Sequence, residues 1–158
     1  MILLEVLKRI YEEWVSWMGK EVHDAVKAVV RHASEEEFLV VQRSAHDSMP
    51  LKWEFPGGGV DETDDSMRGA ALRELEEETG LSGEVLRRGD SGKVELDDRI
   101  LEFHIFEVEV SEGDVELSGE HRDFQWVSKE KIEKLDSDGG MRKGLEAIDE
   151  WDTTASKQ

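Results

Sequence analysis

The feature that most constrains this chain is a predicted helix with three carboxylates on one face, directly preceded by three glycines. We expect the helix to begin near Asp64 or Asp65 and to end at Thr79, because the two Asp and Ser66 supply an N-cap and Gly80 a stop. At about 100° per residue, three acidic side chains fall within an arc roughly 100° wide. These residues are Glu74, Glu77 and Glu78.

Such crowding of like charges destabilises a helix unless a cation lies among the carboxylates. Arg73 is placed to hold Glu77, four residues on, but one guanidinium cannot neutralise three carboxylates. Hard oxygen ligands on a rigid helix suit Mg²⁺ or Mn²⁺. The alternative is a solvated acidic face, which is common in an acidic chain. The glycines upstream favour a ligand site, because they let the backbone approach a ligand closely.

Other glycine-loop and metal-loop motifs do not fit this segment. The glycines are not followed by the Gly-Lys-Ser/Thr ending of a phosphate-binding loop, and the spacing lacks the third glycine of a dinucleotide fingerprint. A calcium loop beginning at Asp61 would require Gly and Glu where Ser66 and Leu72 stand.

Composition narrows the class of protein further. The 158 residues carry 39 Asp and Glu against 20 Lys and Arg, a formal net charge of -19, and no Cys. This length allows one domain. The charge disfavours nucleic acids and anionic membranes as partners, and the lack of Cys excludes disulfides and thiolate chemistry.

The remaining pattern predicts a single mixed domain in the order α, β, β, β, α, β, β, β, α, α. The glycines at 57–59 are expected to lie outside regular structure. We expect a core domain over residues 21–150 and a polar, frayed tail over residues 151–158. Strands are expected at residues 23–33, 38–43, 53–55, 83–96, 100–110 and 124–127, and further helices at 2–18, 129–135 and 139–151.

Residues 1–20 are interpreted as a separate amphipathic helix. Its charged residues interrupt the apolar stretch well before the roughly 20 residues that a membrane span requires. We therefore expect a cytoplasmic protein with no membrane partner. The apolar stripe must be buried against another surface. The alternatives are the helix's own domain, a second copy in a homodimer, and a surface to which the helix anchors. The stripe consists of Leu3, Leu7, Ile10, Trp14 and Trp17.

The segment at residues 57–81 resembles the Nudix box, G-x5-E-x7-R-E-U-x-E-E-x-G-U, in which U is aliphatic. One position departs from the pattern. Counting back from Arg73 places Asp65 at the box glutamate, whereas alignment on the glycine run places Asp64 there, with one residue inserted. The matching residues are Arg73, Glu74, Leu75, Glu77, Glu78, Gly80 and Leu81.

The resemblance, which covers about residues 22–150, implies an α/β/α sandwich around a mixed β-sheet, with the N-terminal helix as an addition. It also implies divalent-metal-dependent hydrolysis of a nucleoside diphosphate linked to another group. The implied metal ligands for Mg²⁺ or Mn²⁺ are Glu77, Glu78 and Glu120, with a carbonyl from Gly58 or Gly59. Glu74 is implied as general base or further ligand, held by Arg73.

Residues before the box are similar to the substrate region of MutT-type members, which places Arg43 near phosphate and Phe55 near the base. This similarity favours a purine nucleoside triphosphate, including an oxidised form, cleaved to monophosphate and pyrophosphate. The alternatives are ADP-ribose, a dinucleoside polyphosphate or another nucleoside diphosphate derivative, and a non-catalytic nucleotide-binding module. The crowded carboxylates favour an enzyme over a binder. Among the five histidines, only His121 beside Glu120 merits a functional test.

Overall fold

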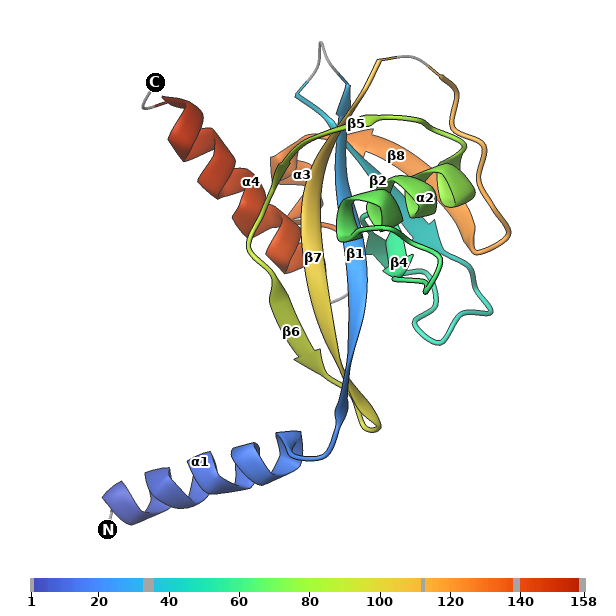
Figure 1. Cartoon of the computed structure of the whole chain (residues 1–158). Coiled ribbons are helices and arrows are strands. Elements are labelled where there is room, and N and C mark those ends of the chain that lie inside the picture. Colours follow the sequence, from blue (N-terminus) through green and yellow to red (C-terminus); the bar gives the residue numbers. More distant parts are fainter. Residues whose placement is uncertain (1, 33–35, 112, 138–139, 157–158) are drawn as a thin grey trace.

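The computed structural model describes residues 2–32, 36–111, 113–137 and 140–156. A mixed β-sheet forms the centre of the molecule (Figure 1). Its main path runs β3-β2-β1-β7-β5, while β4 pairs with β1, β6 with β7 and β8 with β2. The strands within the described residues are β1 (Glu21–His32), β2 (Phe38–Arg43), β3 (Trp53–Glu54), β4 (Gly57–Gly59), β5 (Glu84–Arg88), β6 (Gly92–Glu95), β7 (Arg99–Val110) and β8 (His121–Val127).

The long strands β1 and β7 run parallel, in register from Glu21 opposite Arg99 to His32 opposite Val110. The other pairings between named strands are antiparallel. Because side chains alternate between the two faces of a strand, β1 contributes to two separate cores. Val26, Ala28 and Val30 belong to one core, and Val29 belongs to the other.

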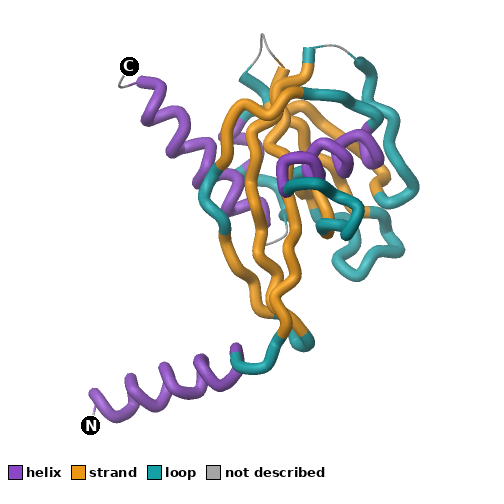
Figure 2. The backbone as a smooth tube through the Cα atoms, in the orientation of Figure 1, coloured by secondary structure: helices purple, strands orange, loops and turns teal. Residues whose placement is uncertain are grey.

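Helices cover both faces of the sheet, as the tube view also shows (Figure 2). Helix α2 (Met67–Thr79) packs Ala70, Ala71 and Leu75 on one face. Helices α3 (Lys129–Ile132) and α4 (Gly140–Ser156) cover the other face, where Ile132, Met141, Ile148 and Trp151 are buried. The predicted α/β/α sandwich around a mixed sheet is confirmed.

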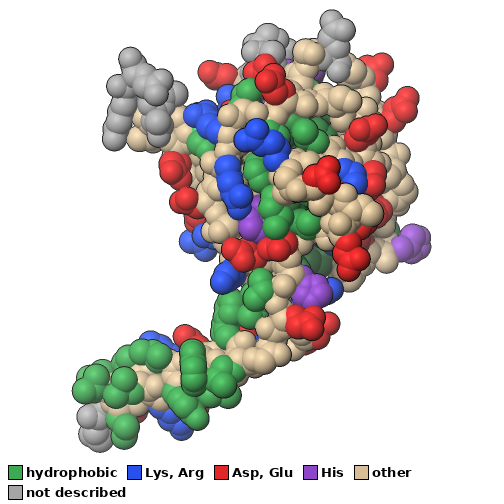
Figure 3. All heavy atoms as spheres, in the orientation of Figure 1, with side chains coloured by type: hydrophobic (Ala, Val, Ile, Leu, Met, Phe, Trp, Pro, Cys, Tyr) green, Lys and Arg blue, Asp and Glu red, His purple; other side chains and the backbone are tan. Residues whose placement is uncertain are grey.

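Helix α1 (Ile2–Trp17) projects away from the sheet and buries none of its residues (Figure 1). Its apolar side chains gather in the space-filling view (Figure 3), and Leu3 and Trp14 are 70% and 60% exposed. The interpretation that α1 packs on its own domain is therefore wrong. Lys20, just after the helix, donates to Glu95 Oε1 at 2.5 Å and to the carbonyl of Leu96 at 3.0 Å. Within the described residues, no helix is long and apolar enough to cross a membrane.

The sequence suggested that the glycines at 57–59 lie outside regular structure. This expectation is wrong, because they form strand β4. Gly57, Gly58 and Gly59 pair antiparallel with residues 25–27 of β1. A Cβ on Gly57 would lie 2.0 Å from the carbonyl oxygen of Val26. The glycines therefore allow a close approach of backbones that a side chain would prevent.

Three other boundaries differ from expectation. Residues 83–96 form two strands, β5 and β6, which both pair with β7. Helix α4 continues to Ser156, through most of the predicted polar tail. Helix α2 begins at Met67, after the N-cap Ser66, whose side chain accepts a hydrogen bond from Gly69 N at 2.9 Å.

Candidate functional site

The predicted glutamates of α2 lie together with the segment that precedes β8. They line a cavity of about 330 Å³ whose walls also include Ser118 and Gly119. The lining carboxylates are Glu74, Glu77, Glu78 and Glu120. The structure thus brings together four acidic residues that the sequence suggested as metal ligands, one of them more than 40 positions from the others.

Glu78 is the innermost carboxylate of this set. It is 3% exposed, and its Oε2 accepts a hydrogen bond from Gly57 N at 3.1 Å. Burial raises the pKa of Glu78 to about 8, and the charges of Glu54 and Glu74 act in the same direction against the opposing effect of Lys27. The protein therefore holds a carboxylate where its charge is disfavoured in the absence of a cation.

Arg73 holds the wall of the cavity in place. Its Nε and Nη2 donate to the two carboxylate oxygens of Asp64 at 2.7 and 2.9 Å. Its Nη1 donates to Glu74 and to Glu77, both at 3.1 Å, and Nη2 also reaches the carbonyl of Gly59 at 3.2 Å. The hydrogen bonds that Arg73 donates to Asp64 raise the pKa of Arg73 and lower the pKa of Asp64.

This geometry distinguishes Asp64 from Asp65. Asp64 takes the bidentate bond from Arg73 and also accepts from Asp61 N at 2.7 Å, whereas Asp65 is exposed. Asp64 is therefore the acid that ties the loop before α2 to Arg73. This agrees with the alignment on the glycine run, which placed Asp64 at the box glutamate.

Gly58 joins the glycine strand to the acidic cavity. A Cβ at this position would lie 2.8 Å from the carboxyl carbon of Glu74. Glycine is thus required if Glu74 is to keep its place beside β4.

A second and larger cavity of about 580 Å³ is lined by β4 and its neighbours. Its lining includes the cations Lys27, Arg43 and Arg99 and the apolar residues Leu101 and Phe103, as well as the glycine strand. We call it the cleft. Because Gly58 lines the cleft and abuts Glu74, the cleft adjoins the acidic cavity.

The two predicted substrate residues have different locations. Arg43 lines the cleft, where its Nε donates to Glu54 at 3.0 Å and its Nη1 to Asp47 at 2.7 Å. Phe55 is only 1% exposed and packs against Gly144 of α4. The expectation that Phe55 faces a base is therefore corrected, since its ring belongs to the core.

Sequence reasoning missed a buried polar network behind the cleft. Glu54, 4% exposed, accepts hydrogen bonds from Lys27 Nζ at 3.2 Å, from Arg43 Nε at 3.0 Å and from His121 Nε2 at 2.8 Å. The available signal was Lys27, a lone charge within an apolar, β-branched run. Glu54 had no such signal, because a two-residue strand shows no alternation.

Comparisons with known proteins agree with this geometry. The family model described as the NUDIX domain matches residues 21–148. The CTP pyrophosphohydrolase of Escherichia coli (strain K12) is 33% identical over 108 residues, which cover 68% of this chain and 77% of that protein. The RNA pyrophosphohydrolase of Sphingopyxis alaskensis is 28% identical over 109 residues, covering 56% of this chain and 68% of that protein.

Solved structures show the same fold. The MutT protein from Methanosarcina mazei Go1 has a TM-score of 0.74 at 30% identity, covering 85% of this chain and 98% of that chain. A C. elegans Ap4A hydrolase has a TM-score of 0.68 at 24% identity, over 84% of this chain and 98% of that one, a likeness of fold alone. The chain therefore belongs to the NUDIX family and is a hydrolase that acts on pyrophosphate bonds of nucleotide derivatives.

Proposed function

We propose that the protein is a Mg²⁺- or Mn²⁺-dependent nucleotide pyrophosphohydrolase whose chemistry takes place in the acidic cavity. The observation that carries this proposal is the convergence of four glutamates on one cavity beside a cleft whose lining includes Lys27, Arg43 and Arg99. The donor set fits a hard divalent cation, since it consists of carboxylates, and Glu78 is buried where its charge needs a counter-ion.

In this proposal Glu77, Glu78 and Glu120 hold the cation, with a carbonyl of Gly58 or Gly59. When bound, a divalent cation lowers the pKa of water and offsets phosphate charge. Glu74 is the proposed general base or a further ligand. Burial, together with the charges of Glu77 and Glu120, raises the pKa of Glu74, which favours proton acceptance. Arg73 orients Glu74 through their 3.1 Å contact.

The cleft is the proposed substrate site. Its volume of about 580 Å³ suits a single nucleotide. Lys27 and Arg43 can meet phosphate, and Leu101 with Phe103 can pack against a base. We propose a purine nucleoside triphosphate, including an oxidised guanine form, as the preferred substrate, with cleavage to monophosphate and pyrophosphate.

The alternative substrates are ADP-ribose, a dinucleoside polyphosphate and another nucleoside diphosphate derivative. CTP is tested as well, because the relative from E. coli is a CTP pyrophosphohydrolase. The deciding experiment measures kcat/KM for dGTP, 8-oxo-dGTP, CTP, ADP-ribose and a dinucleoside polyphosphate. A tenfold advantage for either of the last two, about 1.4 kcal/mol of transition-state binding, would overturn the triphosphate assignment.

The metal site has its own test. A chelator should abolish hydrolysis, and Mg²⁺ or Mn²⁺ should restore it. Glu77→Gln and Glu78→Gln should each lower kcat by on the order of 100-fold, because each removes an anionic ligand. Glu76→Gln is the matched control, since Glu76 is an exposed residue of α2 that does not line the cavity. Near-native rates in both folded variants would disprove the site.

We also propose that the exposed face of α1 forms a homodimer contact. Its apolar residues include Leu7 and Ile10, which are 53% and 55% exposed. A soluble monomer rarely leaves a continuous apolar surface of this kind in water.

A further inference from the structure

Two groups of side chains in the described structure each combine one histidine with two carboxylates. Within each group, one possible ligand atom per residue lies within 4.8 Å of the others. The first group, Glu78, Glu120 and His121, is at the acidic cavity. The second group is Asp24, Glu102 and His104, on strands β1 and β7. The hydrogen bonds of the two histidines distinguish these groups.

His121 has one ring nitrogen occupied and one free among the described residues. Its Nε2 lies 2.8 Å from Glu54 Oε1, while Nδ1 is buried with no hydrogen-bond partner there. Glu54 also pairs with two cations, Lys27 and Arg43, which favours its role as an acceptor toward the ring. This pairing assigns the ring proton to Nε2 of His121, the tautomer that leaves a lone pair on Nδ1.

The ring of His121 belongs to a group that also contains two carboxylates. The carboxylates of Glu78 and Glu120 complete the group around His121. Glu78 and His121 are buried, the His121 side chain being 2% exposed, while Glu120 is exposed. A cation between them would occupy the unpartnered ring nitrogen and offset the charge that burial disfavours on Glu78. A carboxylate that accepts from one ring nitrogen, while the other nitrogen is free, is the usual arrangement around a metal-bound histidine.

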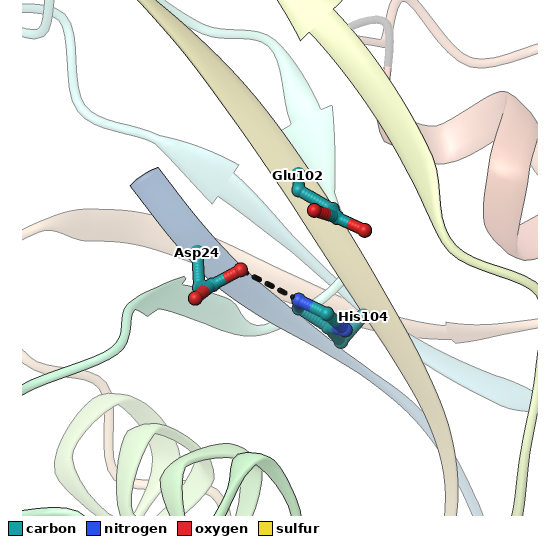
Figure 4. A group of neighbouring side chains, drawn as sticks. All are labelled: Asp24, Glu102 and His104. Carbon is teal, nitrogen blue, oxygen red and sulfur yellow. Dashed lines mark hydrogen bonds and ion pairs between the residues drawn. The ribbon is translucent and has the colours of Figure 1, made fainter. Parts of the chain in front are cut away.

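His104 shows the contrasting case (Figure 4). Its Nε2 lies 2.9 Å from Asp24 Oδ1, and Arg88 contacts its Nδ1. Both ring nitrogens are engaged, and the guanidinium of Arg88 supplies positive charge where a metal would have to bind. The histidine of the second group therefore has no free ring nitrogen, and it serves as a built-in comparison for His121.

We propose that His121 supplies a nitrogen ligand, through Nδ1, to the divalent cation held by Glu78 and Glu120, and that Glu54 orients the ring. This inference rests on the proposed metal-dependent function of the acidic cavity. It has a consequence for metal choice, because Mg²⁺ prefers oxygen ligands, whereas the divalent transition metals accept imidazole as well, Mn²⁺ the most weakly of the series. Relative to Mg²⁺, the site should thus bind Mn²⁺ more tightly than an all-oxygen site would.

The experiment observes the ligand directly, without a substitution. Mn²⁺ is bound to the full-length protein, and electron spin-echo envelope modulation is recorded with natural-abundance and ¹⁵N-labelled histidine. We expect a ¹⁴N coupling to Mn²⁺ that changes to the ¹⁵N pattern on labelling. His104→Gln should keep this coupling, and His121→Gln should lose it. Calorimetry should show His121→Gln binding Mn²⁺ at least tenfold more weakly, with a smaller loss for Mg²⁺.

The outcomes separate this inference from the proposed function. Mn²⁺ binding and metal-dependent hydrolysis without any histidine coupling would overturn the nitrogen ligand alone. A coupling that disappears in His104→Gln and persists in His121→Gln would move the ligand to the second group and also overturn it. Failure of the protein to bind Mn²⁺ or Mg²⁺ would overturn the metal site and this inference together. If His121→Gln does not fold, the wild-type spectrum together with that of His104→Gln decides between the two groups.

Discussion

Two adjacent aspartates have unequal roles at the entrance to α2. Asp64 takes both hydrogen bonds of the Arg73 fork, and Arg73 in turn contacts Glu74 and Glu77. Bidentate pairing of this kind fixes a guanidinium in one orientation. Asp65 is exposed. Asp64 therefore acts on the acidic cavity through Arg73, without lining it.

This arrangement predicts that Asp64→Asn lowers kcat about 10- to 100-fold, the range typical when a residue that orients a metal ligand is lost. Asp65→Asn is the matched control and should keep the wild-type kcat. Steady-state kinetics on the best substrate, with thermal melts to verify folding, measures both. Equal losses in the two variants, or none in either, would contradict the role assigned to Asp64.

The raised pKa of Glu78 predicts how stability depends on pH in the metal-free protein. In the unfolded chain this carboxyl ionises near its ordinary value of 4.5, but in the folded state it keeps its proton up to about 8. Its contribution to stability is therefore present below about pH 4.5 and is lost as the pH rises toward 8, with a slope of at most about 1.4 kcal/mol per pH unit.

Urea unfolding in a chelator at pH 5, 6.5 and 8 tests this dependence. The free energy of unfolding of the wild type should fall relative to that of Glu78→Gln, which has no titrating group at this position. Mg²⁺ should restore stability at pH 8, because the cation binds the ionised form. Parallel pH curves for the two proteins would show that Glu78 does not titrate in this range.

Individual residues differ in how far the sequence predicts them. The three glutamates of α2 were predictable, because helical geometry alone places them on one face. Glu120 required the family resemblance, since its approach to α2 depends on the pairing of β8 with β2. Phe55 was misplaced, because a sequence pattern does not reveal that Gly144 of α4 leaves space for its ring.

At the scale of elements, β4 connects the cleft to the acidic cavity. A Cβ at Gly58 would lie 2.8 Å from the carboxyl carbon of Glu74, whereas a Cβ at Gly59 has no neighbour within 4 Å among the described residues. A methyl group at position 58 can be accommodated if the end of the Glu74 side chain moves. The cost should therefore fall on catalysis more than on folding.

Gly58→Ala should accordingly lower kcat by about 10-fold or more, in line with the cost of misplacing a reacting group by about 1 Å. Gly59→Ala should lower kcat less than Gly58→Ala, because a Cβ at position 59 meets no described atom within 4 Å and the backbone carbonyl remains. Kinetics and thermal melts of both variants check this. If the two substitutions have equal effects on kcat, the contact with Glu74 is not the reason for glycine at position 58.

Elements were predictable where local pattern decides them. Strands β1 and β7 were predictable from long β-branched and alternating runs, and α2 from its cap and stop residues, but the parallel pairing of β1 with β7 was not predicted. The glycine strand β4 was missed because its pairing comes from β1, a tertiary contact that overrides low β-propensity. The division of residues 83–96 into β5 and β6 likewise depends on two separate pairings with β7.

At the scale of the whole molecule, the net charge of -19 predicts a stability that depends on salt. Self-repulsion opposes the compact state, and salt screens it over about 10 Å at 0.1 M. The melting temperature should therefore rise between low and molar KCl. A neutral osmolyte at equal osmolality is the control for general solvent effects. A melting temperature that is flat or falls with KCl would refute the repulsion argument.

The exposed helix α1 gives the last prediction. Because α1 buries none of its residues, deleting residues 1–18 should leave the free energy of unfolding of the remaining domain within about 0.5 kcal/mol of the full chain, measured at protein concentrations where both are monomeric. At higher concentration, light scattering should give twice the chain mass for the full chain and the single mass for the truncated chain.

Leu7→Glu should also give the single mass, because it places a charge on the apolar face. Arg9→Ala, on the polar face, should preserve the dimer. A full chain that stays monomeric at higher concentration would refute the proposed homodimer contact. A truncated domain whose free energy of unfolding falls by several kcal/mol would show that α1 stabilises its own subunit.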